Sequence, residues 1–233
     1  MAPLRGPLRR YYTPYEVAQH NTPEDCWVSF LGEVYELTRL IQRFPGKITE
    51  PIIKAAGTDI SHWFDAKTRT VKTIICPVTE LERFYTPMGR FPHVPPIEPV
   101  NNWDTSFGIP WWRDKKYQVG LLSARIRIIR IKNVLTGQED HLEVPSEETV
   151  VEIRERYSEL NAHAQSYTFK ALVTVPQPGS DKAEMQFQEL DMNKTLLENG
   201  VPDETSTFEQ LMIPTDAFVP VLHVYWNDDL TAA

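Results

Sequence analysis

One segment near the start of the chain, between Tyr12 and Phe64, restricts the fold more than any other part of the sequence. It contains four short patterns in which turn-forming, aromatic and apolar residues follow each other in a specific order. These patterns occupy residues 12–21, 25–29, 32–38 and 56–60. They combine start, turn and stop signals with apolar runs, and so predict a domain of short helices and strands over residues 12–83.

The secondary structure of this segment follows from those signals. Thr13 and Pro14 predict the start of a helix, because a hydroxyl residue caps the first turn and proline suits the first helical position. Residues 27–37 contain two short apolar runs around Gly32, which predicts a tight hairpin. Residues 51–57 begin with proline and end with glycine, as a short helix commonly does.

The order of these patterns strongly resembles that of the cytochrome b5 family. Members of that family hold haem between two histidines, the first in a His-Pro-Gly-Gly loop and the second beyond the next short helix. In this chain the loop reads Phe44-Pro45-Gly46-Lys47, and the second place falls on Arg69. Neither phenylalanine nor arginine is a usual ligand of haem iron. The resemblance therefore implies a cytochrome b5-like domain that lacks both histidine ligands.

Three residues are candidates for the pocket of this domain. We expect Phe44 to point inward and to fill part of the cofactor volume, because an empty apolar pocket would lose many dispersion contacts. His62 and His93 are the nearest histidines that could act as unconventional haem ligands. The alternatives are that His62 is a helix residue with a backbone partner and that His93 lies on the surface or in a linker. No cofactor is favoured, and haem b is the alternative.

Residues 84–120 form a connector that is rich in proline and aromatic residues. Proline favours extended backbone and large aromatic side chains are costly to expose, so the connector is expected to follow a defined path over a surface. It either packs within the chain or uses its aromatic residues to anchor a partner protein, since aromatic residues dominate interface hot spots. The candidate partner-binding residues are Trp103, Phe107, Trp111 and Trp112.

Residues 121–233 have a different pattern. The run Arg125-Ile126-Arg127-Ile128 alternates as a half-buried strand does, and Ile129 and Ile131 continue it with a change of phase that predicts a bulge. A turn, a second alternating run and an amphipathic helix that opens near Ser146 follow.

The remainder of this part predicts a surface loop, a turn and a last strand. Residues 173–185 contain prolines and a glycine and predict the loop, residues 191–201 predict a polar turn with a short helix, and residues 219–226 predict the strand. This succession resembles the ubiquitin-like β-grasp fold. Because conjugable modifiers end in a diglycine and this chain does not, the domain is expected to be a fixed interaction module. The predicted fold class is α+β, with a cytochrome b5-like domain (12–83), the connector (84–120) and a C-terminal ubiquitin-like β-grasp domain (121–233).

Composition excludes several classes of function. The formal net charge of −8 disfavours binding to nucleic acid or to an anionic membrane, because both need clustered Lys and Arg. No apolar run approaches the length of about 20 residues that spans a bilayer. The two cysteines are far apart, which indicates a reducing compartment, no structural zinc and, for Cys26, a core thiol.

The sequence also carries no recognisable catalytic motif, so we expect no enzyme activity. The acidic pair Glu147 and Glu148 fits a solvated helix-capping role better than acid–base chemistry.

The combination of the two domains and the connector resembles a family of cytochrome b5 domain-containing proteins associated with motile cilia. That resemblance implies a non-catalytic structural or adaptor component of the axoneme, on the cytoplasmic side of the cilium, with radial spoke or other axonemal proteins as partners. Direct contact with tubulin is less favoured, because microtubule surfaces and this chain are both acidic. The alternative function is a haem-binding redox or electron-transfer module with non-standard ligands, and a weaker one is a sterol or haem carrier.

Overall fold

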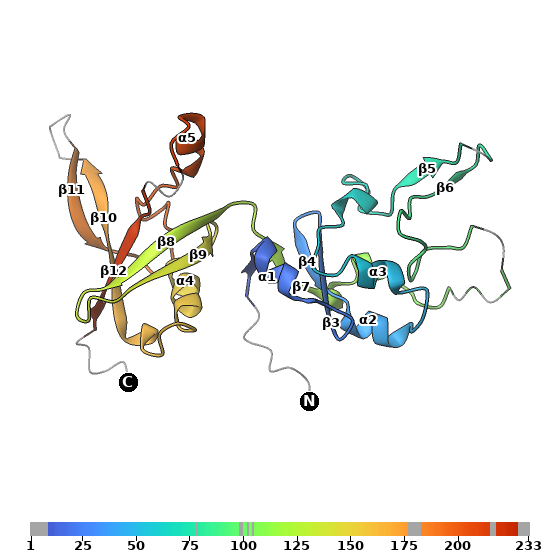
Figure 1. Ribbon diagram of the computed structural model, residues 1–233, viewed down its shortest axis with the longest axis horizontal. Helices are drawn as coiled ribbons and strands as arrows, with labels where there is room; N and C mark the ends of the chain where they lie inside the picture. Colours follow the sequence, from blue (N-terminus) through green and yellow to red (C-terminus); the bar gives the residue numbers. More distant parts are fainter. Residues whose placement is uncertain are drawn as a thin grey trace. The chain divides into compact units, whose positions relative to one another are not determined.

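The chain forms two compact units, Met1–Leu122 (unit 1) and Ser123–Ala233 (unit 2). The structure is a computed structural model, and it describes residues 9–77, 79–97, 100–101, 103, 105–176, 183–214 and 218–227. Strands and short helices occur in both units (Figure 1), so the fold is of the α+β class. The predicted connector is part of unit 1 and not a separate segment, because its last strand completes the sheet of that unit.

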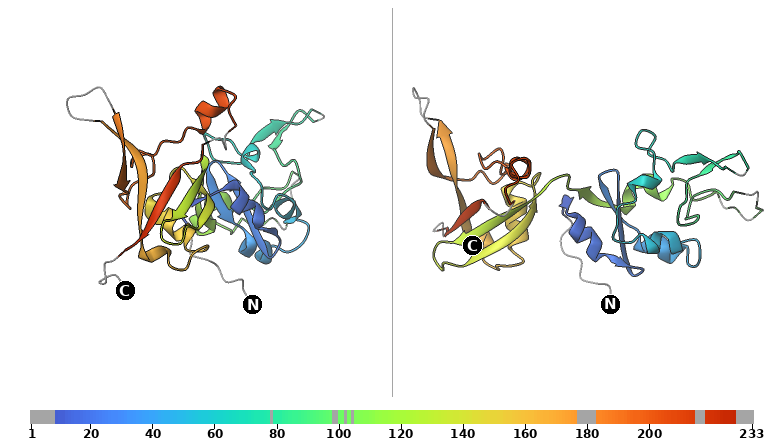
Figure 2. Two further views of the ribbon diagram at one scale, coloured as in Figure 1. Left: turned by 60° about the vertical axis from the view of Figure 1, so that its left-hand side comes forward. Right: turned by 45° about the horizontal axis from the view of Figure 1, so that its top comes forward.

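Unit 1 is built on a five-stranded sheet with the order β1-β7-β4-β3-β2, and a separate ribbon pairs β5 with β6. In all the views of Figures 1 and 2 this ribbon stands out from the rest of the unit. The strands are β1 (Tyr11–Tyr12), β2 (Asn21–Thr22), β3 (Asp25–Phe30), β4 (Glu33–Glu36), β5 (Thr73–Ile75), β6 (Glu82–Phe84) and β7 (Gln118–Leu122). The helices are α1 (Pro14–Gln19), α2 (Thr38–Arg43) and α3 (Glu50–Lys54), with 3-10 turns η1 (Ser61–Trp63), η2 (Trp111–Arg113) and η3 (Lys115–Tyr117).

Local signals account for the first elements of unit 1. Thr13 caps α1 through a complete capping box with Glu16, and Pro14 occupies the first turn. The hairpin between β3 and β4 turns at Leu31 and Gly32, whose φ angles are 50° and 78°. Two successive positive φ angles match the right-handed twist of the paired strands. Both predictions are confirmed.

Strand β7 enters the sheet because Gly120 permits it. The strand pairs with β4 on one side and with β1 on the other. A Cβ atom at Gly120 would lie 2.6 Å from a ring carbon of Tyr12, so only glycine fits this position. This pairing returns the end of the connector to the first domain, which the sequence patterns did not predict.

Unit 2 is a five-stranded sheet with the order β11-β10-β12-β8-β9. Its central pair, β12 and β8, is parallel, and the other neighbours are antiparallel. Helix α4 lies against one face of the sheet (Figure 1), where its apolar side chains join the core. The strands are β8 (Ile126–Asn133), β9 (Glu139–Pro145), β10 (Tyr167–Pro176), β11 (Ala183–Glu189) and β12 (Val221–Trp226), and the helices are α4 (Val150–Tyr157), the 3-10 turn η4 (Ala164–Ser166) and α5 (Thr205–Gln210).

The predicted phase of β8 is wrong. The strand pairs with β9 in one continuous register without a bulge. Ile129 and Ile131 face the core, so the alternation also carries Arg127 inward, where its side chain is only 4% exposed, and leaves Ile128 outside. Register is set by the larger apolar set, because a shift by one residue would expose both core isoleucines.

Three other predictions for unit 2 are also corrected. The range 173–185 is not a loop throughout, because β10 continues to Pro176 and β11 begins at Ala183, while residues 177–182 lie outside the described part. Residues 191–201 form turns, and the short helix comes later as α5. Glu148 is not solvated but is buried with Arg156, and the cap of α4 is Thr149.

Candidate functional site

The first predicted ligand position is occupied by Phe44, which is the C-cap residue of α2. The Phe44 ring is only partly buried, and its centroid lies 5.4 Å from that of His93 in an edge-on contact. The guanidinium of Arg43 covers the same ring at 5.4 Å from its centroid. Phe44 therefore borders the core, and the expectation that it fills the pocket is only partly met.

The second predicted ligand position is committed to other contacts. Arg69 forms an ion pair with Glu33, and its backbone N–H donates a hydrogen bond to the Asp65 carbonyl at 2.9 Å. The adjacent Thr68 carbonyl accepts a hydrogen bond from Arg113 Nη2 at 2.9 Å, which ties this loop to η2. A guanidinium has no free lone pair to offer a metal, so neither histidine position of the family supplies an iron ligand.

His62 does not compensate for these losses. It sits in the 3-10 turn η1 rather than in an α-helix, and its side chain is exposed. Its ring meets the Trp63 ring edge-on at 6.0 Å between centroids. The inward side chain of this turn is Trp63, which is fully buried.

His93 is neither a surface nor a linker residue, because its side chain is 7% exposed and stacks on Phe107 at 4.3 Å between ring centroids. Its Nδ1 accepts a hydrogen bond from the Trp111 backbone N–H at 2.9 Å. In a neutral imidazole that accepts at Nδ1, the proton must sit on Nε2. Ligation of iron through Nε2 needs the opposite tautomer, whose Nδ1 proton would face the Trp111 N–H. His93 therefore does not fit the role of a haem ligand.

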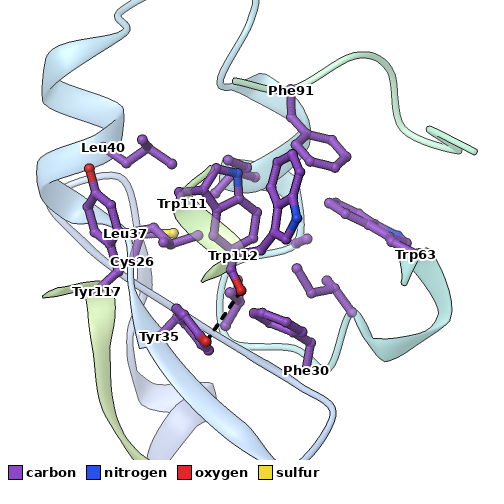
Figure 3. Close-up of a cluster of buried hydrophobic side chains, with 14 of the residues drawn as sticks. Cys26, Phe30, Tyr35, Leu37, Leu40, Trp63, Phe91, Trp111, Trp112 and Tyr117 are labelled. Atoms are coloured by element: carbon purple, nitrogen blue, oxygen red, sulfur yellow. Dashed lines mark hydrogen bonds between the residues drawn. The ribbon is translucent and has the colours of Figure 1, made fainter. Parts of the chain in front are cut away.

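The interior beside these positions is filled by four aromatic side chains from three separate segments (Figure 3). Trp63 stacks on Phe91 at 5.3 Å between centroids, and Trp111 meets Trp112 edge-on at 5.6 Å. Each of the two tryptophans of η2 also lies 6.1 Å from Phe91. Tyr35 Oη donates to Glu33 Oε2 at 2.8 Å, and the Trp112 carbonyl lies 3.5 Å from the same hydroxyl, which places η2 beside β4. The protein thus builds a continuous aromatic core from its own residues.

This core contains unpaired hydrogen-bond donors. Trp63 Nε1, Trp111 Nε1, Trp112 Nε1 and His93 Nε2 are buried and have no acceptor among the described residues. A buried, unsatisfied donor costs about 1–3 kcal/mol, so aromatic packing must outweigh a substantial penalty here. Indole nitrogens are donors only and cannot bind iron. The nitrogen atoms that line this core therefore do not supply the two axial ligands that a haem iron needs.

The predicted partner-binding residues need a correction. Trp111 and Trp112 are buried in the core of unit 1, 0% and 6% exposed, and so offer no surface to a partner. They lie inside because η2 runs directly into η3 and β7, which are bound to this unit. Trp103 and Phe107 are half-buried and contact each other edge-on, and Arg90 covers the Trp103 ring at 5.6 Å. Partner binding by these two residues stays a prediction.

The thiol of Cys26 is a reactive group that lies in the core. Cys26 is fully buried, as expected for a core thiol, and burial together with the charge of Asp25 raises its pKa to about 12. The thiol stays protonated and unreactive at neutral pH.

Within the ranges that the structure describes, no group of three or more His, Cys, Asp or Glu side chains is arranged to hold a metal ion. In the same ranges, no helix is long and apolar enough to cross a bilayer.

A match to a family model supports the family resemblance. Residues 13–84 match the model of the family described as "Cytochrome b5-like Heme/Steroid binding domain". A solved structure, the cytochrome b5 of Ostreococcus tauri virus 2, is similar to 23% of this chain and 67% of its own, at 41% identity and a TM-score of 0.21.

Two relatives match nearly the whole chain. The cytochrome b5 domain-containing protein 1 of Xenopus laevis is 51% identical over 99% of both chains. The protein of the same name from Homo sapiens is 48% identical over 96% of this chain and 92% of its own. At this identity and coverage, the chain belongs to the cytochrome b5 domain-containing protein 1 family.

Proposed function

We propose that this protein is a non-catalytic structural or adaptor protein in which the cytochrome b5 fold serves as a building block. The observation that carries the proposal is the aromatic core of unit 1. Phe44 and Arg69 stand where the family presents its histidines, and Trp63, Trp111 and Trp112 pack the interior beside them. A unit whose interior is filled by its own side chains is suited to bear fixed surfaces rather than a cofactor.

Unit 2 is proposed to be a ubiquitin-like β-grasp domain. Support comes from its strand order, in which the first and last strands, β8 and β12, are parallel neighbours at the centre. Helix α4 follows the first hairpin and packs on one face of the sheet, as the fold requires. Such a domain presents an open sheet face and edge strands, both common docking surfaces.

The proposed place of action is the axoneme of motile cilia, with radial spoke proteins as the partners. This rests on the resemblance of the two-domain combination, and the acidic charge of −8 favours attachment through other proteins over direct contact with tubulin. A tagged protein expressed in ciliated cells is expected to stay with the axoneme after detergent extraction and to crosslink to spoke proteins. Release into the detergent-soluble fraction, or saturable binding to bare microtubules at physiological salt, would contradict this assignment.

The protein is expected to lack stoichiometric haem when purified from cells supplied with the precursor. The physical reason is that the candidate positions present a ring carbon, a guanidinium and a histidine of the wrong tautomer. Absorption spectra recorded before and after desalting check this, with a cytochrome b5 that retains both histidines as the positive control.

The alternative of a haem-binding redox module makes the opposite prediction. A Soret band at one haem per chain, retained on desalting and lost in His93→Asn or in His62→Gln, would establish that alternative. An asparagine side chain in place of His93 puts its Oδ1 at the place of the ring Nδ1 and preserves an acceptor for the Trp111 N–H. Loss of colour in this variant would therefore report loss of a ligand rather than of the fold.

A further inference from the structure

A second candidate site lies in unit 2, and all of its lining residues belong to that unit. A cavity of about 250 Å³ opens between the start of β8, residues 218–220 before β12, and helix α5. We call it the β8–α5 groove. Its lining includes Arg127, Ile128, Asp203, Glu204, Phe208 and Phe218.

The groove lies at the part of β8 where a charged residue faces the core and an apolar residue faces outward. Arg127 occupies a core-facing position, and Ile128 occupies an outward one with 54% of its surface exposed. Arg127 Nη1 donates to the Val201 carbonyl at 3.0 Å, but its buried Nε has no acceptor among the described residues. A charged residue in a core position beside an apolar residue at the surface breaks the usual strand pattern, and such departures at a cavity are typical of functional sites.

The walls of the groove are apolar and exposed. Phe218 is 57% exposed, and Phe208 joins it from α5 as part of the same lining. Leu211, Met212 and Ile213, which follow α5 in the chain, are also exposed, and Met212 is 93% exposed. Exposed apolar residues at a cavity with a polar rim mark a site of protein interaction.

The charge around the groove selects the kind of partner. Glu143, Asp203 and Glu204 line it together with the cation of Arg127. Burial raises the pKa of Asp203, but hydrogen bonds from Thr205, the charge of Arg127 and a hydrogen bond from Ser146 together bring it below its usual value, so Asp203 is ionised at neutral pH. Unit 2 as a whole carries 19 acidic and 9 basic residues. This environment repels a carboxylate ligand and attracts a cationic one.

We propose that the β8–α5 groove binds a peptide segment of a partner protein in which apolar side chains alternate with Lys or Arg. The apolar side chains pack on Ile128, Phe208 and Phe218. Its basic side chains face the carboxylates of the rim.

This inference rests on the proposed adaptor function only in expecting a protein partner. It does not depend on haem, on cilia or on unit 1. The two can therefore fail separately, because the absorption spectrum reports on unit 1 and the experiment below reports on residues of the groove.

The experiment uses the full chain labelled with ¹⁵N and three capped synthetic peptides of equal length. One alternates Leu with Lys, one alternates Leu with Glu, and one replaces each Leu of the first by Ser. The Leu/Lys peptide is expected to shift the amide signals of residues 126–128, 203–208 and 218–219 selectively. The Leu/Glu and Ser/Lys peptides are expected to leave them in place, since the first is repelled and the second lacks the apolar contacts.

Variants locate the interaction. Phe218→Ser removes an exposed apolar wall and is expected to weaken binding of the Leu/Lys peptide by about tenfold, which is the effect of one well-placed apolar contact. Glu204→Gln, at a rim position, is expected to weaken it about two- to fivefold. Leu197→Ser is the matched control, because Leu197 is 65% exposed in the same unit but does not line the groove.

Three outcomes would overturn the proposal. Equal binding of the Leu/Glu peptide would remove the argument from charge. Shifts spread over the acidic surface of unit 2 and unchanged by Phe218→Ser would show non-specific attraction. Concentration-dependent shifts of the groove amides without any peptide would assign the groove to a second copy of this chain.

Discussion

Replacing Trp111 by alanine is expected to lower the free energy of unfolding of unit 1 by about 3–5 kcal/mol. Trp111 is fully buried and touches Phe30, Phe64, Phe91 and Trp112 through its ring. Alanine would leave a cavity at the centre of this aromatic core that rigid neighbouring rings cannot fill. For a unit of this size the loss corresponds to a fall in Tm of at least about 10 °C.

The matched variant is Trp111→Phe. A phenyl ring keeps most of the packing and removes the buried Nε1 donor that has no acceptor among the described residues, so its cost is expected to be less than half that of alanine. Denaturation followed by circular dichroism measures both variants, and the transition of unit 2 serves as the internal reference because the Trp111 core lies within unit 1. A Trp111→Ala protein as stable as the wild type would show that this tryptophan is not part of the core.

Acidification is expected to destabilise unit 1 through His93. Burial, followed by the charges of Arg43 and Lys116, lowers the pKa of His93 from 6.5 to about 4, although Asp114 opposes the shift. The folded state therefore keeps His93 neutral at a pH where the unfolded chain is protonated. A group with a depressed folded pKa contributes its full stability above pH 6.5 and loses it as the pH falls toward 4. The expected loss between pH 7.5 and pH 5 is about 2 kcal/mol.

The difference between wild type and His93→Asn isolates this effect. Asparagine Oδ1 takes the place of the ring Nδ1 and can still accept the Trp111 N–H hydrogen bond, but asparagine does not titrate. We expect the stability advantage of the wild type over this variant to shrink by about 2 kcal/mol from pH 7.5 to pH 5, measured by chemical denaturation at each pH. His62→Gln is the control, because this exposed side chain is expected to change stability by less than about 0.5 kcal/mol. A His93→Asn difference that does not vary with pH would contradict a buried, neutral His93.

The local features around the candidate site, including the replaced histidine positions, could be predicted from the sequence. The cap at Thr13, the hairpin at Gly32 and the loss of histidine at residues 44 and 69 are all properties of a few adjacent residues, and they depend on local backbone preference or on the chemistry of one side chain. What replaces the cofactor volume could not be predicted in the same way. Phe44 is the local candidate, but the interior beside it is also filled by Trp111 and Trp112, which are more than 60 residues further along the chain.

The adjacent tryptophans are a signal with two possible meanings. Large aromatic side chains favour burial in a core and burial in an interface equally, because the gain per unit area removed from water is the same in both. The deciding fact is the return of β7 to the first sheet, which needs Gly120 against the Tyr12 ring. That contact joins residues 108 positions apart and leaves no periodic pattern in the sequence.

The sequence by itself determined the presence of a cytochrome b5-like domain, the replacement of both histidine ligands and the division into two units of different character. Each of these follows from short patterns whose meaning does not depend on distant residues. Only the tertiary structure decided that the connector belongs to the first core, that His93 accepts a hydrogen bond in the wrong tautomer for iron, and that β8 turns Arg127 inward. These depend on which apolar surfaces are buried together, and burial is settled by the packing of the whole unit rather than by any one segment.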